Sequence, residues 1–149
     1  MMDEIDKKIL KRLQQNARVT ISVLSQEISL SMPAISERLK KLEASGVIKQ
    51  YTALLDPSLI KKEMTALIFL GFDRPSNGDM FREKVAEEAD IKECFYITGD
   101  YDYVLKVVTE NTQSLEALLS RIKENPGMIK TETIIVLSTI VDKFAVTID

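Results

Sequence analysis

The sequence predicts an α+β fold made of two parts, and three observations indicate it. Residues 1–62 contain three short apolar patterns with helical spacing and then a β-prone segment. Residues 63–149 instead alternate strand-like and helix-like patterns in the order β-α-β-β-α-β. The charge divides at the same place, with eleven Lys or Arg against seven Asp or Glu in residues 1–62, and nine against sixteen in residues 63–149. A basic part joined to an acidic part is typical of a polyanion-binding domain linked to a domain with another function. Chance variation of surface residues explains the same imbalance.

The composition removes several classes of function. The 149 residues include no His, which excludes a Ser-His-Asp or Cys-His triad and a His-ligated zinc site. The single cysteine, Cys94, allows neither an internal disulfide nor a cysteine metal cluster, as is typical of a reducing compartment. No apolar run reaches the roughly 18 residues of a membrane span, and the acidic N-terminus does not resemble a signal peptide. We therefore expect a cytoplasmic protein with no membrane partner, no cofactor and no enzymatic activity.

The first part reads as three helices. A break at residues 16–18 separates the first two, Thr20 can cap the second, and Ser31 can cap the third, which Gly46 ends. The inward residues of the three helices recur at helical spacing: Ile5, Ile9, Leu10 and Leu13; Ile21, Leu24 and Ile28; Ile35, Leu39 and Leu42.

Two helices joined by a tight turn at about residues 20–42 favour a helix-turn-helix, and the β-branched and aromatic residues of 47–55 predict one or two strands of a wing. The spacing of the third helix, taken alone, favours an ordinary amphipathic surface helix, but the three short helices, the tight turn and the following strand pair reverse that preference. In a winged helix-turn-helix, the third helix would enter the major groove of duplex DNA. Its candidate DNA contacts are Ser31, Pro33, Ala34, Ser36, Glu37, Arg38, Lys40 and Lys41, and those of the wing are Lys49 and Tyr51.

The second part predicts a ferredoxin-like unit. We expect strands at 64–72, 91–98, 103–108 and 128–141, a helix opened by Asp79, and a second helix capped by Thr112 or Ser114. The inward residues of the two helices are Phe81, Val85 and Ala89, then Leu115, Leu118, Leu119 and Ile122.

The last strand is apolar on both faces. Ile134 and Val136 fall on one face and Ile135 and Leu137 on the other, whereas a strand with one wet face should alternate. The face that the two helices leave open is therefore expected to pack against the same face of a second copy. This predicts a homodimer, with assembly to a larger even-numbered oligomer such as a tetramer or octamer.

A short polar loop is the candidate ligand site of the second part. Gly99, Asp100, Tyr101 and Asp102 lie between two expected strands and offer backbone donors and carboxylates, which a small ammonium-bearing ligand requires. A hairpin turn without a ligand has the same composition. An enzyme using Asp100 and Asp102 as acid and base is disfavoured, because alternate residues of a strand end point to opposite sides.

The ordered set of residues in the first part resembles the N-terminal domain of the Lrp/AsnC family, the feast/famine or leucine-responsive transcriptional regulators. The matching positions are Asp6, Ile9, Leu10, Leu13, Asn16, Ala17 and Arg18, then Ile35, Arg38, Leu39, Leu42, Glu43, Gly46, Val47 and Ile48. One departure is visible, since Lys61 and Lys62 follow Ile60 where family members often have a Leu-Gly pair after the aspartate-proline.

This resemblance implies a sequence-specific, nucleoid-associated DNA-binding regulator with a second domain of the RAM or ACT type. Gly99, Tyr101 and Asp102 match the family's G-x-Y-D segment, which shapes an amino-acid effector pocket, and Thr131 and Thr133 match the T-x-T pair that completes it. The family arginine at Arg38 can instead pair with an acid inside the domain. Two alternatives stay open: a ligand-binding module whose helix-turn-helix contacts only protein, and an architectural DNA protein without an effector.

Overall fold

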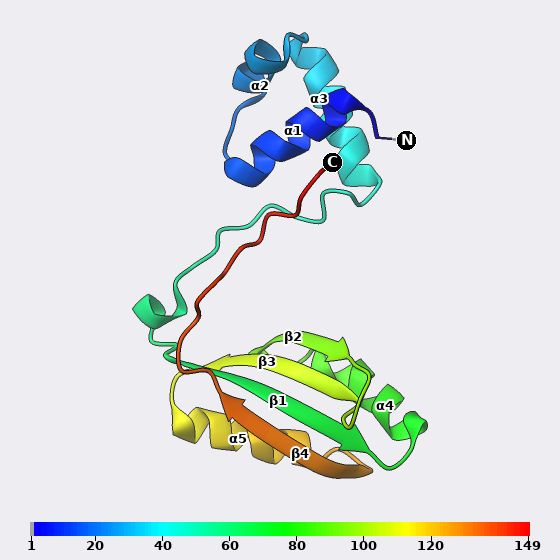
Figure 1. Cartoon of the computed structure of the whole chain (residues 1–149), viewed down its shortest axis with the longest axis vertical. Coiled ribbons are helices and arrows are strands. Elements are labelled where there is room, and N and C mark those ends of the chain that lie inside the picture. Colours follow the sequence, from blue (N-terminus) through cyan, green and yellow to red (C-terminus); the bar gives the residue numbers. More distant parts are fainter. Residues whose placement is uncertain (1) are drawn as a thin grey trace. The chain divides into compact units, whose positions relative to one another are not determined.

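Three helices form the N-terminal unit in the computed structural model, which describes residues 2–149. They are α1 (Glu4–Gln15), α2 (Ile21–Ile28) and α3 (Met32–Ala44), as Figure 1 shows. The expected caps are confirmed, because the Thr20 hydroxyl accepts from Val23 N–H at the start of α2 and the Ser31 hydroxyl accepts from Ala34 N–H at the start of α3. Each helix contributes apolar side chains to one small core, whose buried members are Ile9, Leu10, Leu24, Ile35 and Leu42.

The expected wing strands are not formed. Residues 47–56 contain neither helix nor strand, and a short 3₁₀ turn, η1 (Pro57–Ile60), follows them. Val47, Tyr51 and Leu54 are exposed. The sequence has the β-propensity that predicted a hairpin, but propensity forms a strand only where a neighbouring strand accepts its backbone hydrogen bonds.

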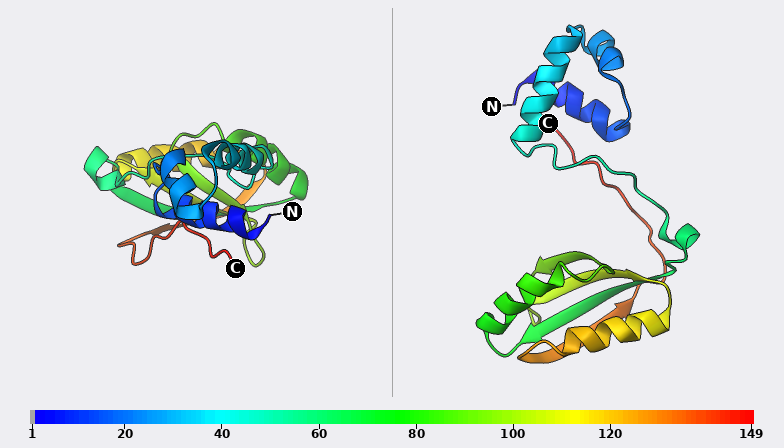
Figure 2. Two further views of the ribbon diagram at one scale, coloured as in Figure 1. Left: turned by 90° about the horizontal axis from the view of Figure 1, so that it is seen from above. Right: turned by 180° about the vertical axis from the view of Figure 1, so that it is seen from behind.

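The second unit is a four-stranded antiparallel sheet with two helices. The elements are β1 (Met64–Phe72), α4 (Pro75–Val85), β2 (Ile91–Tyr96), β3 (Tyr103–Thr109), α5 (Thr112–Lys123) and β4 (Met128–Ile135). The sheet order is β2-β3-β1-β4, as expected for a ferredoxin-like fold. Figure 2 shows α4 and α5 in front of the sheet in the view from behind, so both cover the same face.

The core of this unit lies between the two helices and one face of the sheet. Side chains at alternate positions of β1 and β3 face the helices, which add Phe81, Leu115, Leu118 and Ile122. The opposite faces of the central strands carry Leu67, Phe69 and Val104, which no helix covers. One sheet face is therefore sealed and the other open.

Several element ends differ from the expectation. Strand β2 ends at Tyr96 rather than at residue 98, and β3 ends at Thr109 rather than at residue 108. Helix α4 begins at Pro75 rather than at Asp79, and Asn111 caps α5 in place of Thr112 or Ser114. Strand β4 ends at Ile135 instead of continuing to Val141, because its neighbour β1 begins at Met64 and offers no further residues to pair with. Ile135 pairs with Ala66, and Val136 N–H donates to Thr65 O. Leu137 consequently stands 96% exposed.

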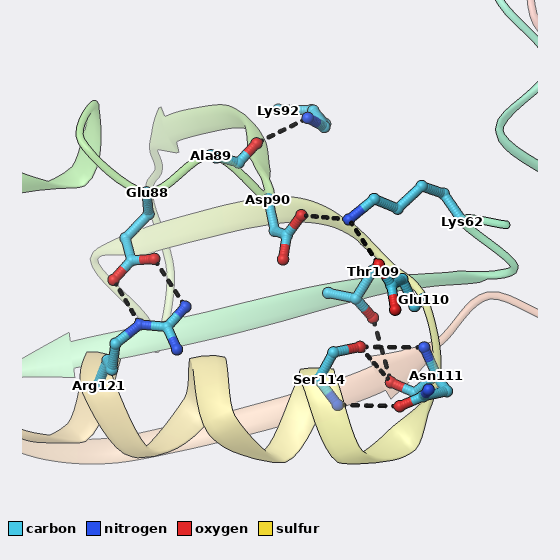
Figure 3. Close-up of polar contacts among 10 residues, drawn as sticks. All are labelled: Lys62, Glu88, Ala89, Asp90, Lys92, Thr109, Glu110, Asn111, Ser114 and Arg121. Atoms are coloured by element: carbon cyan, nitrogen blue, oxygen red, sulfur yellow. Dashed lines mark hydrogen bonds and ion pairs between the residues drawn. The ribbon is translucent and has the colours of Figure 1, made fainter. Parts of the chain in front are cut away.

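Polar contacts fasten the helices and loops at one end of the sheet (Figure 3). Lys62 Nζ lies 3.0 Å from Asp90 Oδ1, so the segment entering β1 is tied to the turn before β2. Arg121 on α5 donates through two nitrogens to the Glu88 carboxylate, at 2.9 Å each. A planar, two-bond contact of this kind fixes orientation as well as distance.

The C-terminal residues belong to the N-terminal unit. The chain divides into one compact unit of Met1–Leu54 with Val141–Asp149 and a second of Leu55–Ile140. With the C-terminal residues included, the first unit holds ten Lys or Arg against eight Asp or Glu, a smaller basic excess than residues 1–62 alone. None of the helices of residues 2–149 has the length and apolar character needed to cross a membrane.

Candidate functional site

The exposed face of α3 carries most of the residues expected to contact DNA. Pro33, Glu37, Lys40 and Lys41 are exposed, and their spacing of three or four residues places them on one side of the helix. Ser31 and Ala34 lie at the N-terminal end, where the Ser31 hydroxyl is already used as the cap. Ser36 is half-buried beside this face.

Arg38 forms ion pairs within the N-terminal unit, which is the second of the two roles that the sequence left open for it. Its Nη1 donates to Asp3 Oδ2 and to Asp6 Oδ1, each at 2.8 Å. Hydrogen bonds to Asp6 and Asp3 raise the pKa of Arg38 further above its already high ordinary value. Because Asp3 and Asp6 also form the capping box of α1, Arg38 ties the start of α1 to the middle of α3.

Two charged side chains of the exposed α3 face form an ion pair with each other. Lys41 Nζ lies 2.8 Å from Glu37 Oε1, and this ion pair lowers the pKa of Glu37. Both side chains are more than two-thirds exposed, so the pair contributes little to stability and can be exchanged for another partner. Lys40 lies beside them on the exposed surface.

The two candidate wing residues stand on an irregular segment rather than on strands. Lys49 is exposed. Tyr51 donates from its hydroxyl to Glu43 Oε1 at 3.1 Å, so its segment is tied back to the C-terminal part of α3. Partial burial and this hydrogen bond raise the pKa of Tyr51.

The loop before β3 is fixed mainly by Asp102. Its N–H donates to Leu70 O at 2.8 Å, and its Oδ2 accepts from Phe72 N–H at 2.7 Å. The backbone and the side chain of Asp102 are therefore both hydrogen-bonded to the end of β1. Gly99 has a φ of +113°, a backbone conformation that favours glycine, and Asp100 is exposed.

Asp102 lines a cavity of about 130 Å³ at the N-terminal end of α4. Arg82 contributes its guanidinium, which donates from Nε to the Tyr103 hydroxyl at 2.8 Å and lies 4.7 Å from the centre of the Tyr96 ring. Asp79 stands nearby, with Oδ1 3.8 Å from Arg82 Nη1. The cavity thus presents carboxylates and a guanidinium close together, a combination that suits a small zwitterion.

The remaining effector candidates do not line this cavity. Tyr101 packs against Phe69 and lies under Lys130 Nζ, and a hydrogen bond with Glu132 raises its pKa. Thr131 and Thr133 lie on β4 opposite Leu70 and Ile68, so β1 separates them from β3. Among the six candidates, Asp102 alone joins the cavity.

Sequence reasoning missed Arg82, Asp79 and Tyr96 as members of a site. The sequence predicts a helix opened by Asp79 and a strand at 91–98, but it assigns no role in a site to any of the three. An Asp and an Arg three residues apart near a helix start are common on surfaces, so no local signal distinguishes them. Only the tertiary fold brings them to Asp102.

The open sheet face forms a broad apolar hollow of about 770 Å³. Leu67, Phe69, Phe95 and Val104 line it, and Ile134 on β4 pairs with Leu67 at its edge. Ile135 pairs with Ala66, which faces the helices. Of the four candidate interface residues, Ile134 therefore lies on the open face and Ile135 on the covered face, while Val136 and Leu137 lie beyond the strand.

Comparison with known proteins agrees with both units. Residues 65–146 match the family described as the Lrp/AsnC ligand binding domain, and residues 2–49 match a winged helix-turn-helix DNA-binding family. The chain is 38% identical to the HTH-type transcriptional regulator FL11 of Pyrococcus horikoshii, over 93% of this chain and 91% of that protein. It is 31% identical to the leucine-responsive regulatory protein of Escherichia coli, over 93% of this chain and 87% of that protein.

A solved structure extends the likeness to the whole chain. The crystal structure of a transcriptional regulator from Neisseria meningitidis in complex with L-methionine has a TM-score of 0.90 and 28% sequence identity, covering 99% of this chain and 97% of that one. The matched families occur in the same order as the two units described above. The chain belongs to the Lrp/AsnC family of DNA-binding transcriptional regulators.

Proposed function

We propose that this regulator binds duplex DNA through the exposed face of α3 and that an amino acid, held beside Asp102, changes its assembly and its DNA affinity. The observation that carries the proposal is the cavity in which the Asp102 carboxylate and the Arg82 guanidinium stand together in the unit that matches a ligand-binding family. The Neisseria relative, crystallised with L-methionine, supports the choice of ligand class.

The DNA-binding role is assigned to the side chains that are exposed on α3. Ser31, Pro33, Ala34 and Ser36 would allow close approach of the helix to the groove. Glu37, Lys40 and Lys41 would face bases and phosphates, with Lys49 and Tyr51 beside them, while Arg38 acts by positioning α3.

A charge-removal experiment tests the DNA surface. Lys40→Ala should weaken binding to a mixed-sequence duplex and reduce the slope of log affinity against log salt by about 0.9, the value for one phosphate contact. The matched control is Lys123→Ala on α5, which removes the same charge from the other unit. Fluorescence anisotropy over a salt series measures both. Equal slopes for the two variants would contradict the proposal that α3 contacts the DNA phosphates.

The effector role is assigned to complementary charges. The α-ammonium of an amino acid would pair with the Asp102 oxygen that Phe72 leaves free, and its α-carboxylate would accept hydrogen bonds from Arg82. The cavity is smaller than the roughly 300–1,000 Å³ of typical ligand pockets, so a neighbouring subunit is expected to complete it. Gly99, Asp100, Tyr101, Thr131 and Thr133 are then candidates for the outer part of the pocket.

Thermal-shift measurements with each standard amino acid test the effector site. At least one should raise the melting temperature of the parent protein, and Asp102→Asn should abolish that shift while keeping an oxygen for Phe72 N–H. Asp100→Asn in the same loop is the control. Arg82→Gln should also abolish the shift, and Lys84→Gln on the same helix should not. A shift that survives both substitutions would move the site, and no shift with any amino acid would favour an architectural DNA protein.

Assembly is the proposed link between ligand and DNA. The open sheet face would pack against the same face of a second copy, giving a homodimer that associates further into an even-numbered oligomer. A ligand that binds one assembly better than another shifts the population toward it. The number of helix-turn-helix units that can engage DNA together would change, and with it the avidity. Light scattering with and without the active amino acid measures this shift.

A further inference from the structure

Residues 141–149, which we name the strap, return to the N-terminal unit, where the chain ends beside its helices (Figure 1), and they border a groove there. The strap has neither helix nor strand and forms one wall of the groove with residues 144–146 and Ile148. The second half of α1 and residues 47–52 form the other walls, and the groove volume is about 630 Å³. Its lining is mostly apolar, with Leu10 and Leu13 at the base.

The side-chain amide of Gln14 forms hydrogen bonds with the backbone of the strap. Gln14 Nε2 donates to Val146 O at 3.0 Å, and Val146 N–H donates to Gln14 Oε1 at 2.6 Å. One side-chain amide thus satisfies both polar backbone groups of a single residue, as an adjacent strand does in a sheet. This contact recognises an extended chain rather than a particular side chain.

The side chains of the strap follow the same geometry. Apolar residues alternate at Phe144, Val146 and Ile148, the period of an extended segment. Ile148 packs against the three-helix core, whereas Phe144 and Val146 remain more than half exposed. The strap is therefore anchored at its middle by Gln14 and at its end by Ile148.

We propose that the strap is an integral part of the DNA-binding unit: Gln14 holds it on α1, and Ile148 completes the core of the three helices. The inference does not depend on an effector. It adds to the family assignment a specific role for Gln14, which positions the strap, and for Ile148, which closes the core.

Limited proteolysis of the full chain tests the Gln14 contact. Trypsin binds its substrate as an extended chain on both sides of the cleaved bond, so the Gln14 contact at Val146, three residues past Lys143, should slow cleavage there, and Gln14→Ala should speed it about five- to tenfold by removing two hydrogen bonds. Gln15→Ala, the adjacent residue of the same type, is the matched control and should cleave at the parental rate. Cleavage after Lys123 at the end of α5 reports on the other unit and should stay constant. Equal rates for the two glutamine variants would overturn the proposal.

A second pair of variants tests the core contact without touching α1. Ile148→Ala should lower the melting temperature of the three helices, measured by circular dichroism, whereas Thr147→Ala, which does not line the groove, should leave it unchanged. An unchanged melting temperature in both variants would overturn the structural role of the strap. Protection of the Lys143 bond that disappears on dilution would show that a second copy supplies the strap and would overturn the assignment to the same chain.

Discussion

Replacing Phe95 by alanine should weaken homodimer formation about 10- to 150-fold. Phe95 lies on β2 at the open sheet face and is 52% exposed, so about half of its side chain remains to be buried by a second copy. Full burial of such a side chain stabilises by about 1.5–3 kcal/mol, and half of that is about 0.75–1.5 kcal/mol. A two-fold dimer contains the residue twice, which gives about 1.5–3 kcal/mol and the stated change in dissociation constant.

Analytical ultracentrifugation over a dilution series measures this dissociation constant. The control is Met80→Ala on α4, because Met80 is similarly exposed, at 45%, but lies on a helix of the covered face. Circular dichroism of both variants verifies that the fold is retained. The reasoning is refuted if Phe95→Ala and Met80→Ala dissociate alike, or if the parent protein is a monomer at micromolar concentration.

Three further predictions follow from the geometry. Ile134→Asp should dissociate the assembly and leave the fold intact, whereas Ile135→Asp should lower the melting temperature of the ferredoxin-like unit; the reverse outcome would contradict the register of β4 with β1. Gly46→Ala should lower the free energy of unfolding, measured by urea denaturation, by about 1–2 kcal/mol, because the φ of Gly46 is +76°. Gly127→Ala should lower it more, since the added Cβ would also meet Asn77 and Asp73. Equal losses of stability would exclude that clash. Hydrogen bonds from Asp6 N–H and then from Arg38 lower the pKa of Asp3, so its stabilising contribution is lost as the pH falls through that lowered pKa. Acid titration of the melting temperature should therefore be flatter in Arg38→Ala, and an unchanged pH profile would show that the contact is not formed.

Much of the fold could be predicted because its signals are local. The run from Met64 to Phe72 gives the strand with the observed bounds, and Thr20 and Ser31 cap the helices that they were expected to cap. These features depend on a few neighbouring residues, whose hydrogen bonding and apolar spacing act within one element.

The failures arose where a distant partner decides. Residues 47–55 and residues 136–141 have strand composition, but the first has no neighbouring strand among residues 2–149 and the second extends past the start of β1. The resemblance to a family pointed to Asp102, which lines a polar cavity, whereas Arg82 reaches that cavity only through the packing of α4. For Arg38 the resemblance allowed an acidic partner inside the domain, and only the packing of α1 against α3 identifies that partner as Asp3 and Asp6.

The hydrogen bonds between Gln14 and Val146 join residues that are 132 positions apart. This separation determines when the contact can form during synthesis of the chain. At synthesis rates of about 5–20 residues per second, roughly 7–26 s pass between the appearance of α1 and that of its last partner. Throughout that interval Leu10 and Leu13 have one uncovered side, and the ferredoxin-like unit is translated in the meantime. Until the strap is made, the contacts of Gln14 with Val146 and of Ile148 with the three-helix core are missing, so the packing of the first unit is completed only after the ferredoxin-like unit has been translated.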